Sequence, residues 1–205
     1  ARARVAVLRG PAGLAVRLAR GSSLASALGL GSVGLLNGLV ARTAAELYAQ
    51  VKDEWGFSSS IAGKVLDWAA RLHERGLDIS HDGYQRHGAY IAEHAAMPGV
   101  PRAEQRFLAV LIGGQRHSIE QNEFDGLPAS WRDTGLRLLL ILRLAVLLNR
   151  SRKAALRTPV RLRADGRGLV VSIDANWLAE NPLTIADLER EREFHAEVGY
   201  LLDFQ

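Results

Sequence analysis

Apolar residues recur at helical spacing through most of the chain after Ala44. Their positions predict helices over residues 44–55, 61–75, 81–94, 104–113 and 131–149. The helix predicted over 131–149 is the most apolar of these, but Arg137 and Arg143 interrupt its apolar sequence. We therefore expect a buried core helix there and not a transmembrane one.

The period of the pattern changes after Thr158-Pro159. Apolar and polar residues alternate over 160–164 and again over 169–173. Between these runs, the sequence from Asp165 to Gly168 has the composition of a tight turn. The pattern predicts a β-hairpin.

The remaining residues predict a short helical turn over 176–180, a helix over 184–198 and a strand over 200–204. Thr184 and Asp187 form a capping-box pattern at the start of that helix. The expected fold class is mainly α. An all-α helical domain over 44–157 precedes a small ββ-α-β domain over 158–205.

Residues 1–43 differ from the rest, because they hold six arginines and no acidic residue. Arginines followed by an uncharged stretch, here Gly21 to Ala41, are typical of a secretory signal, a membrane anchor or a transit peptide. The frequent glycine and serine residues weaken transfer of this stretch into a membrane. The alternatives are a poorly ordered arm, a helix that packs on the body through Leu24, Leu28, Leu35 and Leu39, or out-of-frame reading of a GC-rich gene. All of these stay open from the sequence.

The composition excludes several kinds of functional site. The 205 residues are 48% hydrophobic and 23% charged, which is typical of a globular protein. The absence of cysteine excludes a disulfide scaffold, a thiolate metal site and a cysteine nucleophile. The net charge of +4 comes from residues 1–43, because residues 44–205 carry 20 basic and 22 acidic side chains. The folded body is therefore nearly neutral.

Five of the six histidines lie between positions 73 and 117, and clustered histidines are a signal of a metal site. Leu72-His73-Glu74, His87-Gly88-Ala89, His117 with Asp125-Gly126, and Leu144–Asn149 together resemble the motifs of HD-superfamily metal phosphohydrolases. The resemblance implies metal ligands at His73, Glu74, His87 and His117. However, glutamate and asparagine stand at positions 74 and 149, where that superfamily has aspartates, and no histidine precedes His73.

A second resemblance covers more of the chain. The run Leu77-Asp78-Ile79-Ser80-His81-Asp82-Gly83-Tyr84-Gln85-Arg86-His87-Gly88-Ala89-Tyr90-Ile91 is similar to the C-terminal region of exopolyphosphatases and guanosine pentaphosphate phosphohydrolases, the Ppx/GppA family. So are Met97-Pro98-Gly99, residues 142–152, Trp177-Leu178, Pro182-Leu183-Thr184 and Asp187-Leu188-Glu189. The similarity runs in order from about Ala44 to Phe204. It implies an HD-like helical domain with a degenerate metal site, followed by a small α/β domain.

In that family, N-terminal actin-like domains carry out hydrolysis with magnesium. The glycines of residues 10–38 do not form a phosphate-binding strand–loop–helix motif. The resemblance therefore implies no catalytic residue and no cofactor in this chain, with magnesium expected only in the full-length family enzyme. It also implies inorganic polyphosphate and the actin-like domains as partners, a homodimer and a cytoplasmic location, without nucleic acid or membrane.

A basic segment gives local support for a phosphate-rich partner. Residues 143–167 hold eight basic side chains and one acidic one, whereas residues 174–203 hold eight acids and two arginines. Arginine suits phosphate oxygens through bidentate hydrogen bonds. The candidate polyphosphate ligands are Arg143, Arg150, Arg152, Lys153, Arg157 and Arg161, with Arg86 and Arg116 as a second group. The alternative is that the basic segment pairs with the acidic helix and that the histidines are hydrogen-bonded inside the core.

We thus expect the non-catalytic C-terminal portion of an exopolyphosphatase-type phosphohydrolase, inactive alone, which binds polyphosphate and dimerises. The alternative is an HD-type metal-dependent phosphohydrolase that acts on guanosine polyphosphates or another nucleotide. A nucleic-acid binder ranks last, because the body is net acidic and no aromatic residues interleave with the arginines.

Overall fold

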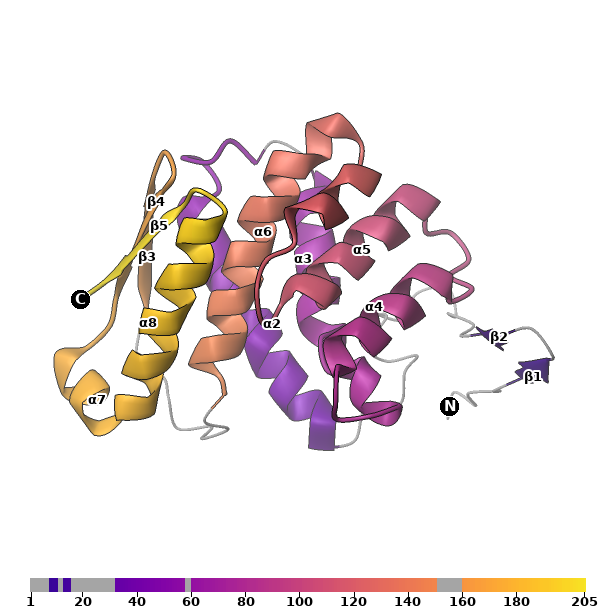
Figure 1. Cartoon of the computed structure of the whole chain (residues 1–205), viewed down its shortest axis with the longest axis horizontal. Coiled ribbons are helices and arrows are strands. Elements are labelled where there is room, and N and C mark those ends of the chain that lie inside the picture. Colours follow the sequence, from indigo (N-terminus) through magenta and orange to yellow (C-terminus); the bar gives the residue numbers. More distant parts are fainter. Residues whose placement is uncertain (1–7, 11–12, 16–31, 58–59, 151–159) are drawn as a thin grey trace, which may run out of the picture.

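Helix α6 (Ala129–Leu148) forms the centre of the fold (Figure 1). In the computed structural model, which describes residues 8–10, 13–15, 32–57, 60–150 and 160–205, every side chain from Leu138 to Ala145 is buried. A helix that is apolar on all sides must be covered on all sides. The expected buried core helix is confirmed, and within the described ranges no helix has the length and apolarity that crossing a membrane requires.

Of the helices that precede α6 in the chain, α2 (Ser32–Val51), α3 (Ser60–Leu72) and α5 (Arg102–Gly114) pack directly on it. Helix α4 (Tyr84–His94) packs on the outer side of α5. Two 3₁₀ helices, η1 (Arg75–Asp78) and η2 (Gln121–Gly126), lie in the connections before α4 and α6.

The C-terminal part forms a sheet in the order β3-β4-β5, with β3 (Arg161–Asp165) antiparallel to β4 (Gly168–Ser172) and β4 parallel to β5 (Leu201–Phe204). Helices α7 (Ala175–Glu180) and α8 (Pro182–Glu197) connect β4 to β5. Helix α8 packs on both α6 and β5. A small two-stranded sheet, β1 (Leu8–Gly10) and β2 (Gly13–Ala15), lies at the opposite end of the molecule (Figure 1).

Two glycines allow the sharp reversals around the sheet. Gly166 takes a left-handed φ of 55° in the two-residue loop of the predicted hairpin, which is confirmed. Gly199 has a φ of 77° directly after α8, and the amide of Tyr200 donates to the carbonyl of His195 across this reversal. The chain therefore turns from α8 straight into β5.

The helices and the sheet share one apolar core. Leu162, Val171 and Leu188 belong to the same cluster of buried residues as the leucines of α6. Polar contacts cross the same interface, because Arg137 of α6 donates to the hydroxyl oxygen of Tyr200 at 3.0 Å. The mainly α fold class with a small C-terminal sheet is confirmed, and the acidic helix α8 is held against the end of α6.

Two local expectations are wrong. The first helix begins at Ser32 and not at Ala44, since Asn37, Val40 and Ala41 are buried against the core and this packing outweighs their glycine-rich surroundings. The capping box at Thr184 does not form. Helix α8 begins two residues earlier, at Pro182, whose fixed φ suits the first helical position.

Candidate functional site

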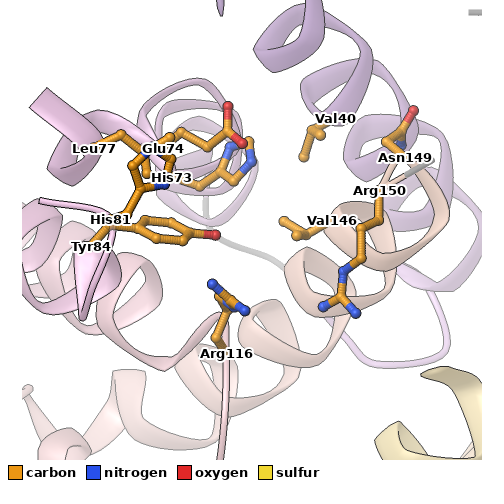
Figure 2. Close-up of a pocket in the computed structure, with 10 residues that line it drawn as sticks. All are labelled: Val40, His73, Glu74, Leu77, His81, Tyr84, Arg116, Val146, Asn149 and Arg150. Carbon is orange, nitrogen blue, oxygen red and sulfur yellow. The ribbon is translucent and has the colours of Figure 1, made fainter. Parts of the chain in front are cut away.

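A cleft of about 280 Å³ opens where the C-terminal ends of α3, α5 and α6 meet (Figure 2). Its residues come from four parts of the chain that are distant in sequence. They are Val40, His73, Glu74, Leu77, His81, Tyr84, Arg116, Val146, Asn149 and Arg150. We call it the larger cleft.

Close backbone packing positions Tyr84 at this cleft. Gly76 of η1 lies directly against the start of α4, and a Cβ atom at position 76 would come within 1.8 Å of the carbonyl oxygen of Tyr84. Gly88, one turn further along α4, also faces Gly76. The two glycines therefore let η1 and α4 approach closely enough to place the Tyr84 ring beside His81.

His73 is buried at the end of α3 and offers an acceptor. Its Nδ1 lies 2.8 Å from the carbonyl oxygen of Ala70, so Nδ1 carries the proton and Nε2 is unprotonated in the neutral ring. Burial lowers the pKa of His73 below its usual value, which favours this neutral form. Gln115 at the end of α5 donates to the carbonyl oxygen of His73 and so fixes the junction of α3 and α5.

Three donors lie across the same space. The Tyr84 hydroxyl and the guanidinium groups of Arg116 and Arg150 point into the larger cleft (Figure 2). The Arg116 guanidinium lies 5.1 Å from the centre of the Tyr84 ring, a cation–π contact that orients it. Arg150 donates from Nη1 to Asp187 on α8 at 2.7 Å, and its other donors are directed by this contact.

A smaller cleft of about 120 Å³ adjoins the larger one and shares Arg116, Val146 and Arg150 with it. It lies between the end of α6, the connection after α5, and α8. Its remaining lining residues are Gln115, His117, Arg143, Leu147, Asp187, Arg190, Glu191 and Phe194.

His117 marks this cleft as electropositive. Its pKa is lowered by burial and then by the charges of Arg116, Arg190, Arg86 and Arg143. It also has a φ of 63°, and it is the one residue other than glycine with a positive φ in the described part of the chain.

Arg143 has a structural partner in this cleft. Its side chain is 2% exposed, and it donates from Nε and Nη2 to the two carboxylate oxygens of Glu191 and from Nη1 to the carbonyl oxygen of Gly114. Arg143, which the sequence suggested as a polyphosphate-binding residue, is therefore paired with the acidic helix α8, as the alternative interpretation of the basic segment predicts.

The structure separates the other predicted phosphate ligands. Arg116 and Arg150 line both clefts. Arg86 is exposed on α4, where its charge contributes to lowering the pKa of His117. Arg161 is exposed on β3 and lines neither cleft. Arg152, Lys153 and Arg157 lie outside the described residues.

The predicted metal ligands are not assembled. His73 and Glu74 line the larger cleft and His117 lines the smaller one, whereas His87 lies on α4 and lines neither. Among the residues that the structure describes, no three histidine, aspartate or glutamate side chains form a group that could hold a metal ion. Asn149 is neutral where the HD superfamily has an aspartate, and its amide nitrogen donates to the hydroxyl oxygen of Thr43 at 2.9 Å.

Residues 38–192 match the profile of "Ppx/GppA phosphatase, domain III". The chain belongs to the Ppx/GppA phosphatase family. The resemblance seen in the sequence is thereby confirmed, and it spans the helices and α8 that build both clefts.

Curated relatives of this Ppx/GppA chain carry the name guanosine-5'-triphosphate,3'-diphosphate pyrophosphatase. The protein of Vibrio vulnificus is 35% identical over 167 residues, which cover 80% of this chain and 32% of the relative. That of Vibrio parahaemolyticus is 38% identical over 169 residues, and that of Aeromonas hydrophila is 30% identical over 158 residues, each match covering 32% of the relative. The matched part of this chain spans about a third of the length of these relatives.

Sequence reasoning missed Tyr84, Arg190 and Asp187 as site residues. Tyr84 falls in the helix predicted over 81–94, and nothing in that pattern indicates that the close approach of Gly76 and Gly88 brings it to a cleft. Arg190 did carry a signal, because it is one of two arginines in an otherwise acidic segment.

Proposed function

We propose that this chain is the C-terminal, non-catalytic portion of a Ppx/GppA phosphohydrolase and that its larger cleft binds phosphate groups of the substrate. The observation that carries the proposal is the convergence of the Arg116 and Arg150 guanidinium groups and the Tyr84 hydroxyl in one cleft of about 280 Å³. Arginine pairs with phosphate oxygens through charge-assisted hydrogen bonds, and a tyrosine hydroxyl adds a further donor.

Guanosine pentaphosphate is a better candidate substrate than the inorganic polyphosphate expected from the sequence. The names of the similar Vibrio and Aeromonas proteins favour it. The cleft supports the same choice, because the unprotonated Nε2 atom of His73 adds a hydrogen-bond acceptor to the lining that the arginines share. The ionised internal phosphates of a linear polyphosphate have no proton to donate to such an acceptor, whereas a guanine base has N–H donors.

Hydrolysis would require the actin-like domains with their magnesium, as the family resemblance implies. The expected homodimer and cytoplasmic location stay predictions. The alternative of a metal-dependent hydrolase within this chain is disfavoured, since its four expected ligands are divided between two clefts and α4.

The test is calorimetric titration of the purified chain with guanosine pentaphosphate and with linear polyphosphate. We expect binding that weakens steeply between about 50 and about 200 mM salt, because phosphate contacts are screened. Arg116→Gln and Arg150→Gln should each reduce the affinity about tenfold or more, the effect of losing a hydrogen bond to a charged group.

Arg161→Gln is the matched control, because it removes the same charge from an exposed strand position outside both clefts. The proposal is overturned if neither ligand binds at low salt, or if the control substitution reduces the affinity as much as the cleft substitutions do. Tighter binding of linear polyphosphate than of guanosine pentaphosphate would return the choice of substrate to polyphosphate.

A further inference from the structure

The smaller cleft contains two arginines whose charge is not balanced by an ion pair. Of the four arginines that line it, Arg143 is paired with Glu191 and Arg150 with Asp187. Arg116 and Arg190 form no ion pair within the part of the chain that the structure describes. After the internal pairs are formed, the cleft therefore keeps an excess of positive charge.

Aromatic contacts hold these two guanidinium groups in place. Arg116 lies over Tyr84, and Arg190 lies 5.7 Å from the centre of the Phe194 ring. A cation–π contact uses the face of the guanidinium and leaves its N–H groups in the plane to bind a ligand. Both arginines are thus oriented donors.

Gln115 gives an independent sign of a ligand. It is 3% exposed, it lines the smaller cleft, and its Oε1 atom has no hydrogen-bond partner within the described structure. Its Nε2 already donates to the carbonyl oxygen of His73, so the amide orientation is fixed with the acceptor atom left over. A buried acceptor without a partner is costly, and a terminal phosphate group in its monoanionic form has a hydroxyl that can donate the missing hydrogen bond.

We propose that the smaller cleft is a second phosphate-binding subsite, in which Arg116, Arg190 and Gln115 hold a terminal phosphate group of the ligand. This inference rests on the proposed function, because the remaining phosphates of the same ligand occupy the larger cleft. A volume of about 120 Å³ is the space of roughly four water molecules, which suits one phosphate group and is too small for a nucleoside. Arg116 and Arg150 line both clefts and so bridge the two positions.

His117 provides a spectroscopic readout of this subsite. The charged groups around it are Arg116 beside it, Arg190 on α8, Arg86 on α4 and Arg143 on α6, and all four lower its pKa. The carboxylates of Asp187 and Glu191 line the same cleft. A phosphate bound between Arg116 and Arg190 adds negative charge there, so binding should raise the pKa of His117.

The experiment combines affinity with this titration. Binding of guanosine pentaphosphate is measured for the unmodified chain, for Arg190→Gln and for Arg192→Gln, a control that removes the same charge two residues along α8. Arg192 hydrogen-bonds the carbonyl oxygen of Leu202 and lines neither cleft. The pKa of His117 is followed by NMR with and without ligand, and its signal is assigned through His117→Asn, since asparagine tolerates the left-handed backbone.

We expect Arg190→Gln to weaken binding about tenfold or more, the control to change it less than about twofold, and the ligand to raise the pKa of His117. If the ligand binds and Arg150→Gln weakens it, but Arg190→Gln does not, the subsite is refuted and the proposed function stands. A pKa of His117 that the bound ligand leaves unchanged also refutes the subsite. If the unmodified chain binds no ligand, the proposed function and the subsite fail together.

Discussion

The buried ion pair between Arg143 and Glu191 gives the sharpest prediction about stability. It joins three elements, because Arg143 belongs to α6, Glu191 belongs to α8, and Arg143 also donates to Gly114 of α5 at 2.7 Å. The side chains are 2% and 9% exposed, so water cannot replace either partner. His195, which is fully buried, lies with Nε2 3.4 Å from the same carboxylate.

Glu191→Gln keeps the size of the side chain and removes the charge. The Arg143 guanidinium is then left in the core without a counter-charge, and breaking such a pair costs about 3–5 kcal/mol. We expect the lower end of this range, because the glutamine oxygen still accepts one hydrogen bond. Since native domains are stable by only about 5–15 kcal/mol, this is a large fraction of the total.

The assay is urea unfolding followed by circular dichroism, for Glu191→Gln, Arg143→Met and the double variant. We expect the double variant to be more stable than the sum of the two single losses predicts, because it removes both charges together. Arg192→Gln is the control, since its pair with Asp203 is largely exposed and should contribute less than about 1 kcal/mol. A loss of less than about 1 kcal/mol for Glu191→Gln would refute the claim that this pair holds α8 on α6.

Three further predictions concern the same region. Burial acts to raise the pKa of Glu191, but the nearby His195 and the hydrogen bonds and charge of Arg143 outweigh it and hold the pKa below its usual 4.5. Stability should therefore fall as the pH drops from about 4.5 towards the folded-state pKa. Urea midpoints measured between about pH 3 and 7 check this, and an equal fall in Glu191→Gln would contradict it. Asp187→Asn removes the partially exposed ion pair with Arg150 and should tighten binding of guanosine pentaphosphate about two- to fivefold, because Arg150 is then free to pair with the ligand. Unchanged or weaker binding by calorimetry would show that Asp187 does not compete with the ligand. Gly76→Ala should lower the free energy of unfolding by about 1–3 kcal/mol and weaken ligand binding, because the added Cβ atom would clash with the carbonyl oxygen of Tyr84 at the start of α4. Gly63→Ala is the control: its Cβ atom would make an ordinary contact of 3.6 Å with Tyr48, so the melting temperature should not fall.

The elements with a strong local signal could be predicted from the sequence. The hairpin follows from alternation and a glycine turn, and α6 follows from an apolar run too long for a strand. The start of α2 was not decided by the sequence, which left a packing helix before Ala44 as one of several alternatives, because Asn37 and the glycines around it lower helix propensity and packing on the core holds them. Helix α8 was predicted correctly, but its first residue was predicted at Thr184 and lies at Pro182, because both residues carry signals for a helix start.

The site was harder to predict than the fold, because a sequence shows how many charges a segment carries and not which of them are paired. The basic segment and the acidic helix gave two competing interpretations, phosphate binding or internal pairing. In the structure, Arg143 is buried in a pair with Glu191, whereas Arg150 faces both Asp187 and the cleft. The basic segment thus contains one buried arginine that is paired inside the protein and one that lies at the cleft and is available for the proposed phosphate binding.

This division explains why the smaller cleft lies where α8 meets α6. The Arg143–Glu191 pair fixes the acidic helix at that point, and fixing it brings Arg190, one residue before Glu191, to the same cleft as Arg116. Glu191 and Asp187 on α8 neutralise Arg143 and Arg150, and among the described residues Arg116 and Arg190 form no ion pair, which suits them to the proposed ligand. A substitution that loosens α8 should therefore weaken phosphate binding even though it touches no phosphate. In Glu191→Gln the affinity and the stability should fall together, whereas in Arg190→Gln the affinity should fall alone.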